Sequence, residues 1–273
     1  MSKIVKAVKV KKANAVAKVK KVPESGHGKN VDNFGKLIAL VESLGTDFKP
    51  ANAKLKVLGL NTMYSDCKAD KQLVIDSITP YKTMIGTRLS DFAVVRPLIT
   101  RILGATKSLE LPDESIQEVR AFVRKIRGTR VVPLPKEPIT SADTTTVSDE
   151  GTDLKTHSIS QTSYTNIVDH MNGIKSVLVG DVAIYLPNET DLTTASVTTL
   201  IEKLELDNKN CDTTFYTLYN ARTKRNKGLY SDKIGILSVV AGVKEYFKSA
   251  YGANSSQYRQ ITKIIFKDCS KEL

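Results

Sequence analysis

The stretch FKPANAKL, residues 48–55, recurs in altered form as YLPNETDL, residues 185–192. The aromatic residue, the proline and the leucine of the two stretches coincide at one constant offset, which relates Pro50 to Pro187. The same offset continues to Arg88, which aligns with Arg225. Because self-similarity at a fixed spacing is typical of duplicated units, we interpret the chain as two diverged copies of one unit.

The offset becomes larger further along the two copies. Leu89-Ser90 aligns with Leu237-Ser238, and Gly104-Ala105 aligns with Gly252-Ala253, both at this second offset. The second copy therefore carries 11 extra residues, NKGLYSDKIGI, which we place between its second and third helices. The order of the matches favours duplication over the alternative, which is two unrelated helical segments that share a generic periodicity.

Apolar residues recur at helical spacing in both copies. In the first copy we expect a helix from Asp32 to Leu44, then a long helix that Pro80 kinks or breaks. In the second copy we expect a helix over 164–178 and a longer one over about 189–225. The fold class predicted is all-α, with two tandem four-helix-bundle-like repeats over 31–128 and 164–273.

Two further segments lack the periodicity of a packed helix. Residues 129–163 are rich in Ser and Thr, with several prolines, and are typical of an exposed linker. Residues 1–30 consist mainly of Lys, Val and Ala, and we expect them to be a basic tail that is disordered without a partner.

The positive charge is concentrated in that tail. The chain carries a net charge of +12. Most of it comes from residues 1–30, which contain nine lysines and only one acidic residue, Glu24. Basic arms of this kind commonly bind nucleic acid and less often anionic lipid.

Part of the second copy resembles a known group of proteins. TDLTTASVTTLIEKLELDNKNCDTTFYTLYNARTKRNKGLY, residues 190–230, precedes VKEYFKSAYGANSSQYRQI, residues 243–261. Together they resemble uncharacterised bacterial proteins, mainly from Bacteroidota, over residues 188–264. The resemblance implies a helical repeat and supplies no activity and no site.

The residue types that carry catalysis or bind metals are scattered. His27, His157 and His170 share no helical face with one another or with Cys67, Cys211 and Cys269. We therefore predict no triad, no metal site and no cofactor. Residues 25–30, SGHGKN, lack the Walker spacing of a phosphate loop, and we interpret them as a flexible joint between tail and domain.

Basic residues at helical spacing are the remaining candidates for a site. One group lies in the last helix of the first copy and another in the last helix of the second, where residues four apart would share a face. We expect no ladder of exposed aromatic side chains, so binding would be electrostatic and weakly sequence-specific. The candidate nucleic-acid-binding residues are Lys3, Lys6, Lys9, Lys11, Lys12, Lys18, Lys20, Lys21, Arg120, Arg124, Arg127, Arg259, Lys263 and Lys267.

These observations favour a non-enzymatic protein that binds RNA or DNA. The alternative is a structural or scaffolding protein whose helical units pack on copies of themselves or on other proteins, and an enzyme is the least favoured class. No apolar run approaches the ~18 residues of a membrane span, and no uninterrupted apolar stretch resembles a signal peptide. We therefore expect a cytoplasmic protein without a membrane partner.

Overall fold

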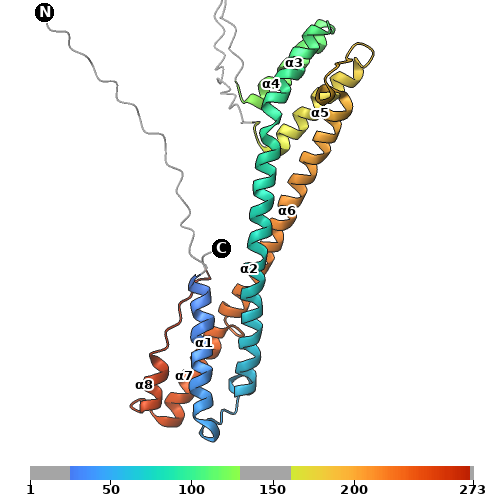
Figure 1. Cartoon of the computed structure of the whole chain (residues 1–273). Coiled ribbons are helices and arrows are strands. Elements are labelled where there is room, and N and C mark those ends of the chain that lie inside the picture. Colours follow the sequence, from blue (N-terminus) through green and yellow to red (C-terminus); the bar gives the residue numbers. More distant parts are fainter. Residues whose placement is uncertain (1–24, 130–160, 271–273) are drawn as a thin grey trace, which may run out of the picture. The chain divides into compact units, whose positions relative to one another are not determined.

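The computed structural model of the protein describes residues 25–129 and 161–270. Every regular element in these ranges is a helix, so the all-α prediction is confirmed. The elements in Figure 1 are α1 Ser25–Ser43, η1 Gly45–Asp47, η2 Ala53–Leu55, α2 Val57–Ala93, α3 Val95–Ser108, α4 Asp113–Arg127, α5 Tyr164–Gly180, η3 Thr190–Leu192, α6 Thr194–Tyr230, α7 Ile236–Tyr251 and α8 Ser256–Thr262.

Helix α1 begins earlier than the sequence predicts. Residues 25–30, expected to be a flexible joint, form its first turns. His27 and Asn30 are buried there, and the Nδ1 atom of His27 forms a hydrogen bond of 2.8 Å with the Oη atom of Tyr230. The rest of the predicted tail, residues 1–24, and residues 130–160 of the predicted linker lie outside the described ranges.

The sequence predicts that Pro80 kinks or breaks the long helix, but α2 is not broken there. It continues from Val57 to Ala93. A proline inside a helix leaves the carbonyl four residues earlier without its intrahelical donor. Pro80 and Asp76, which carries that carbonyl, are both exposed, so water can supply the missing hydrogen bond.

The two long helices correspond closely. Helices α2 and α6 are both 37 residues long. Their first and last residues are related by the same offset as Pro50 and Pro187, and so are the bounds of the turns η2 and η3. Because α6 continues to Tyr230, the first five of the 11 extra residues are helical rather than part of a connection. The offset found in the sequence therefore recurs in the helix bounds.

The described residues divide into two compact units. Unit 1 extends to Asp76 and resumes at Tyr219, whereas unit 2 comprises Ser77–Leu218. This division differs from the expected tandem order of 31–128 and 164–273, because each unit takes helices from both halves of the sequence. The length of the long helices gives the physical reason. A helix of this length extends about 55 Å, too long to bury its apolar face within one small bundle.

Unit 1 consists of α1, the first part of α2, the last part of α6, α7 and α8. Within it α2 and α6 lie side by side, and the Nζ atom of Lys224 is 2.9 Å from the Oδ1 atom of Asp70. Its buried apolar core is aliphatic and aromatic, with one cysteine. The core residues are Val31, Phe34, Leu37, Ile38, Val41, Phe48, Leu60, Cys67, Leu229, Ile236, Val239, Val240, Val243, Phe247 and Ile261.

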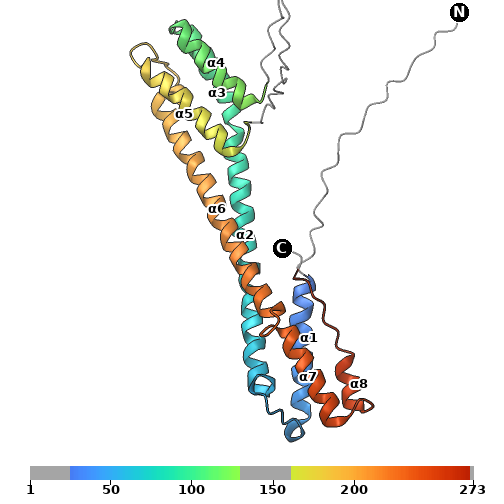
Figure 2. The ribbon, with the colours of Figure 1, turned by 180° about the vertical axis from the view of Figure 1, so that it is seen from behind.

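Unit 2 consists of the last part of α2, α3, α4, α5 and the first part of α6. Helix α4 packs against α5, as Figure 2 shows from behind, and Lys203 of α6 is paired with Asp91 of α2 at 2.5 Å. The core residues are Phe92, Val95, Ile99, Ile102, Leu111, Val119, Val123, Ile126, Val168, Met171, Ile174, Leu178, Tyr185, Leu192, Val197, Ile201 and Leu204.

Buried positions in the two units match at the first offset of the sequence. Buried apolar residues of α1 recur as buried apolar residues of α5 along one side of each helix. The aligned pairs are Val31 with Val168, Phe34 with Met171, Leu37 with Ile174 and Val41 with Leu178.

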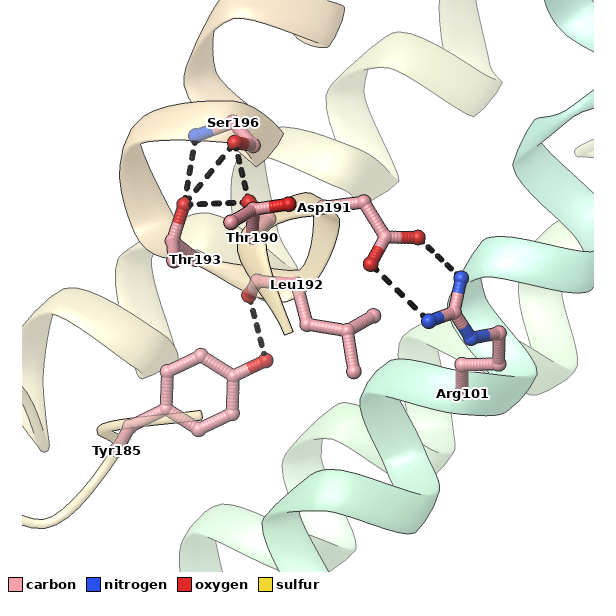
Figure 3. A network of polar contacts seen from close by, with 7 residues as sticks. All are labelled: Arg101, Tyr185, Thr190, Asp191, Leu192, Thr193 and Ser196. Carbon is pink, nitrogen blue, oxygen red and sulfur yellow. Dashed lines mark hydrogen bonds and ion pairs between the residues drawn. The ribbon is translucent and has the colours of Figure 1, made fainter. Parts of the chain in front are cut away.

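A polar network fixes the turn that leads into α6 in unit 2 (Figure 3). The hydroxyl of Tyr185 donates to the carbonyl oxygen of Leu192 at 2.9 Å, and both residues are buried. Asp191 of η3 forms a two-pronged ion pair with Arg101 of α3, and one of its two hydrogen bonds measures 3.0 Å. The turn η3 is therefore tied to a helix from the other half of the chain.

None of the helices in the two described ranges is long and apolar enough to span a membrane.

Candidate nucleic-acid interface

A groove lined by lysines lies in unit 1, between the first turns of α1 and the segment that follows α8. Its volume is about 660 Å³. Four of its lining residues are lysines, and no carboxylate of the described chain lines it. The lining residues are Gly26, Lys29, Asn30, Asn33, Lys36, Lys263, Ile264, Ile265 and Lys267.

Two asparagines of α1 hold the second wall of the groove in place. The side-chain amide of Asn30 donates to the carbonyl oxygen of Lys267 at 2.7 Å, and its Oδ1 atom accepts from the Lys267 N–H at 3.1 Å. One turn later the side-chain amide of Asn33 donates to the carbonyl oxygen of Ile265 at 2.8 Å. Since the main chain of residues 265–267 bonds to α1, its lysine extends from a fixed backbone.

A fifth lysine supports this wall from behind. The Nζ atom of Lys244, in α7, donates to the carbonyl oxygen of Ile264 at 2.9 Å and lies over the ring of Phe266. Burial lowers the pKa of the Lys244 ammonium group, because the charged form loses contact with water. The contribution of Lys244 is therefore structural, since its hydrogen bond holds the main chain of the groove wall at Ile264.

No carboxylate in residues 25–129 and 161–270 forms an ion pair with the ammonium groups that line the groove. Lys29, Lys36, Lys263 and Lys267, which carry these groups, are all exposed. The nearby carboxylate of Asp32 faces Lys71 instead, at 3.7 Å.

The prediction that three basic residues share one face of the last helix is wrong. Arg259, Lys263 and Lys267 cannot share a helical face, because α8 ends at Thr262. Lys263 follows the helix directly and Lys267 belongs to the segment held by Asn30. The structure still brings Lys263 and Lys267 together in the groove, whereas Arg259, exposed on α8, does not line it.

The predicted arginines of the first copy lie in the other unit, on α4. Arg120 and Arg127 are exposed, and Arg124 is half-buried. The guanidinium of Arg127 donates to the hydroxyl of Thr100 at 2.7 Å, and that of Arg120 donates to Gln117 at 3.2 Å. These arginines therefore do not line the groove. The predicted tail lysines, Lys3 to Lys21, lie outside the described residues.

Sequence reasoning misses two residues of the groove. It places Lys29 in the tail and does not single out Lys36. The sequence does contain a signal that the first helix begins before Asp32. Residues at spacings of four and three form one face that starts before that position, namely His27, Val31, Phe34, Ile38 and Val41.

The structure also exposes aromatic side chains that the sequence does not predict. Phe215 and Tyr216 of α6 are both exposed, their ring centroids lie 5.4 Å apart, and Tyr81 packs on Phe215 at 5.7 Å. The spacing of Phe215, four from Cys211 and three from Leu218, instead predicts that it belongs to the apolar stripe of the long helix. A neighbouring pocket that Tyr216 lines contains several carboxylates and one lysine, so this surface disfavours a phosphate backbone. The carboxylates are those of Asp169, Glu205 and Asp212.

Some titratable groups away from the groove have shifted pKa values. Lys203 lowers the pKa of Asp91 through a hydrogen bond, and burial raises the pKa of the adjacent Asp207. Burial also raises the pKa of Cys67 to about 12, which keeps this thiol protonated. Within the described ranges no group of three His, Cys, Asp or Glu side chains could hold a metal ion. The buried, unpaired cysteines are Cys67, Cys211 and Cys269.

Comparison with known proteins gives no relative. No family model, no curated protein and no solved structure matches this chain. The resemblance to a group from Bacteroidota stays a prediction.

Proposed function

We propose that this chain is a non-enzymatic nucleic-acid-associated protein that binds the phosphate backbone of RNA or DNA. The observation that carries the proposal is the groove of unit 1, where Lys29, Lys36, Lys263 and Lys267 converge without a lining carboxylate of the described chain. Lysines that replace the counterions of a nucleic acid gain affinity from the release of those ions.

The construction of the groove suits a repeating anion. Lys29 and Lys36 extend from α1, two helical turns apart, and Lys263 and Lys267 extend from the segment that the α1 asparagines hold beside it. The four charges are therefore distributed along the two walls of the groove. The lining residues offer ammonium groups but no aromatic side chain, which favours backbone contacts over base recognition.

The lysine-rich segment before α1 adds further positive charge next to the groove in the sequence. Residues 3–21 carry eight lysines and precede Gly26, which lines the groove. We propose that these lysines, Lys3, Lys6, Lys9, Lys11, Lys12, Lys18, Lys20 and Lys21, bind the same nucleic acid as the groove.

The test replaces the four groove lysines by glutamine and titrates the protein against one duplex at several salt concentrations. Each lost phosphate contact reduces the slope of log K against log salt by about 0.9 on duplex DNA, so the variant should lose about 3 to 4. The matched control changes four exposed lysines outside the groove, Lys54, Lys82, Lys107 and Lys233, and should keep the full slope. Equal losses in the two variants would contradict a role for the groove.

One observation favours the second candidate, a scaffolding protein. The end of α5 and the segment directly after it expose four apolar side chains that are close in the sequence, Val179, Val182, Ile184 and Leu186. Clustered exposed apolar residues are typical of surfaces that contact other proteins. Substituting Val182 and Leu186 by serine should lower the mass of the purified protein in light scattering if this surface supports assembly.

A further inference from the structure

The two halves of the chain, residues 25–129 and 161–270, build both compact units in the same reciprocal way. Unit 1 combines the first helix of half 1 with the third and fourth helices of half 2. Unit 2 combines the first helix of half 2 with the third and fourth helices of half 1. Neither half forms a complete unit by itself.

Individual contacts repeat this exchange. In unit 1, His27 at the start of α1 is hydrogen-bonded to Tyr230 at the end of α6, and these residues belong to different halves. In unit 2, the residue aligned with His27 is Tyr164, which starts α5. Its ring packs on Phe92, near the end of α2, at 4.7 Å. Each first helix therefore contacts the end of the long helix from the other half.

The cores show the same dependence. Phe48 of half 1 packs its ring on Tyr246 and Phe247 of half 2, at 5.0 and 5.8 Å. Phe122 of half 1 fills the space over Gly173 of half 2, where an added Cβ atom would lie only 2.4 Å from the ring. Separating the halves would expose both phenylalanine side chains to water, and this cost makes each half a specific binding partner for the other.

The connection between the two halves contains more residues than are needed to join the end of half 1 to the start of half 2. A Cβ atom on Gly128 would lie 2.9 Å from the Cγ2 atom of Thr162, so the two ends of the connection lie next to each other. A few residues could join them. Residues 129–161 could instead span about 110 Å when fully extended, at about 3.3 Å per residue, which is enough to reach a second molecule.

We propose that two copies of this chain dimerise by exchanging halves, so that half 1 of each copy pairs with half 2 of the other. Every contact inside the compact units is kept in such a dimer, and only the connection takes a different path. The partner is a second copy of this chain, recognised through the same surfaces that build the monomer. This inference rests on the fold and not on the proposed function.

The experiment refolds the full-length chain from denaturant at low and at high protein concentration and measures its mass by light scattering. The monomer has a mass of 30.0 kDa, and a species of twice that mass should increase with concentration. The matched control replaces residues 131–159 by a short Gly-Ser segment, which still closes the chain but cannot reach a second copy, and should stay monomeric. A full-length chain that stays monomeric at every concentration would overturn the proposal.

A protease site inserted between residues 140 and 150 separates exchange from simple side-by-side association. Cutting an exchanged dimer should return species with the mass of the intact monomer, each holding one half from either copy. Cutting the monomer should leave its mass unchanged under native conditions. A dimer that keeps its mass after cutting, or a cut monomer that falls apart into separate halves, would refute the exchange.

Discussion

His27 and Tyr230 lie near opposite ends of the described chain and are joined by a hydrogen bond of 2.8 Å between the Nδ1 and Oη atoms. Asn30 donates to the same hydroxyl at 3.1 Å, so the first turns of α1 and the end of α6 form one buried polar cluster. The same α1 supplies Asn30 and Asn33 to the lysine-lined groove. The interlocking of the two halves therefore also positions the candidate site.

Gly173→Ala tests the packing of α4 on α5. Alanine normally stabilises a helix interior by roughly 0.5–1 kcal/mol relative to glycine. At this position the new Cβ atom would meet the ring of Phe122 at 2.4 Å, so we expect a net destabilisation of about 1–3 kcal/mol in urea unfolding. Gly86→Ala in α2 is the control, since nothing lies within 4 Å of its Cβ position, and it should be stabilising. Equal effects at the two glycines would contradict the α4–α5 contact.

Tyr230→Phe tests the buried polar cluster of unit 1. The substitution keeps the ring and removes the hydroxyl that bonds to His27 and Asn30. Leaving their buried polar atoms without this partner should cost about 1–3 kcal/mol of unfolding free energy, measured by urea denaturation. Tyr216→Phe is the matched control because Tyr216 is exposed, and its hydroxyl should contribute almost nothing. A Tyr230→Phe protein as stable as this control would argue against the cluster.

Alkaline pH should weaken unit 2 through Tyr185. Burial raises the pKa of Tyr185 from its ordinary value near 10 to about 12. Above pH 10 the unfolded chain releases a proton that the folded protein still holds, so the stability due to the neutral hydroxyl falls between pH 10 and 12. This loss is on the order of 2 kcal/mol.

Tyr185→Phe isolates that contribution. At pH 7 the variant should be less stable than the natural chain by about 1 kcal/mol, since the hydrogen bond to Leu192 is lost. As the pH rises from 10 to 12 the difference in unfolding free energy should shrink and then change sign, because the natural chain loses more stability than its hydrogen bond contributes. A difference that stays constant up to pH 12 would show that Tyr185 is not protected from titration.

The sequence predicts the individual helices better than it predicts which helices pack together. The offset that relates Pro50 to Pro187 also relates the bounds of the two long helices. Periodicity likewise identifies buried positions such as Val197, Ile201 and Leu204. It cannot assign the two ends of one helix to different cores, because a stripe of apolar residues does not specify which partner covers it.

The misplaced boundaries have a common cause. His27 resembles part of a flexible joint because two glycines flank it, and Lys267 resembles a helical residue because it follows Lys263 at a spacing of four. Both positions are decided by contacts from the other end of the sequence, since His27 bonds to Tyr230 and Lys267 bonds to Asn30. Local propensity carries no information about such long-range partners.

The most direct test of phosphate-backbone binding is the salt dependence of affinity for one duplex, measured with the full-length chain and with a chain lacking residues 1–22. If five or six tail lysines engage phosphates, deletion should reduce the slope of log K against log salt by about 5, and the groove lysines should keep a remaining slope of about 3 to 4. Both proteins should remain equally helical by circular dichroism. Absence of binding by the full-length chain at low salt would contradict the account.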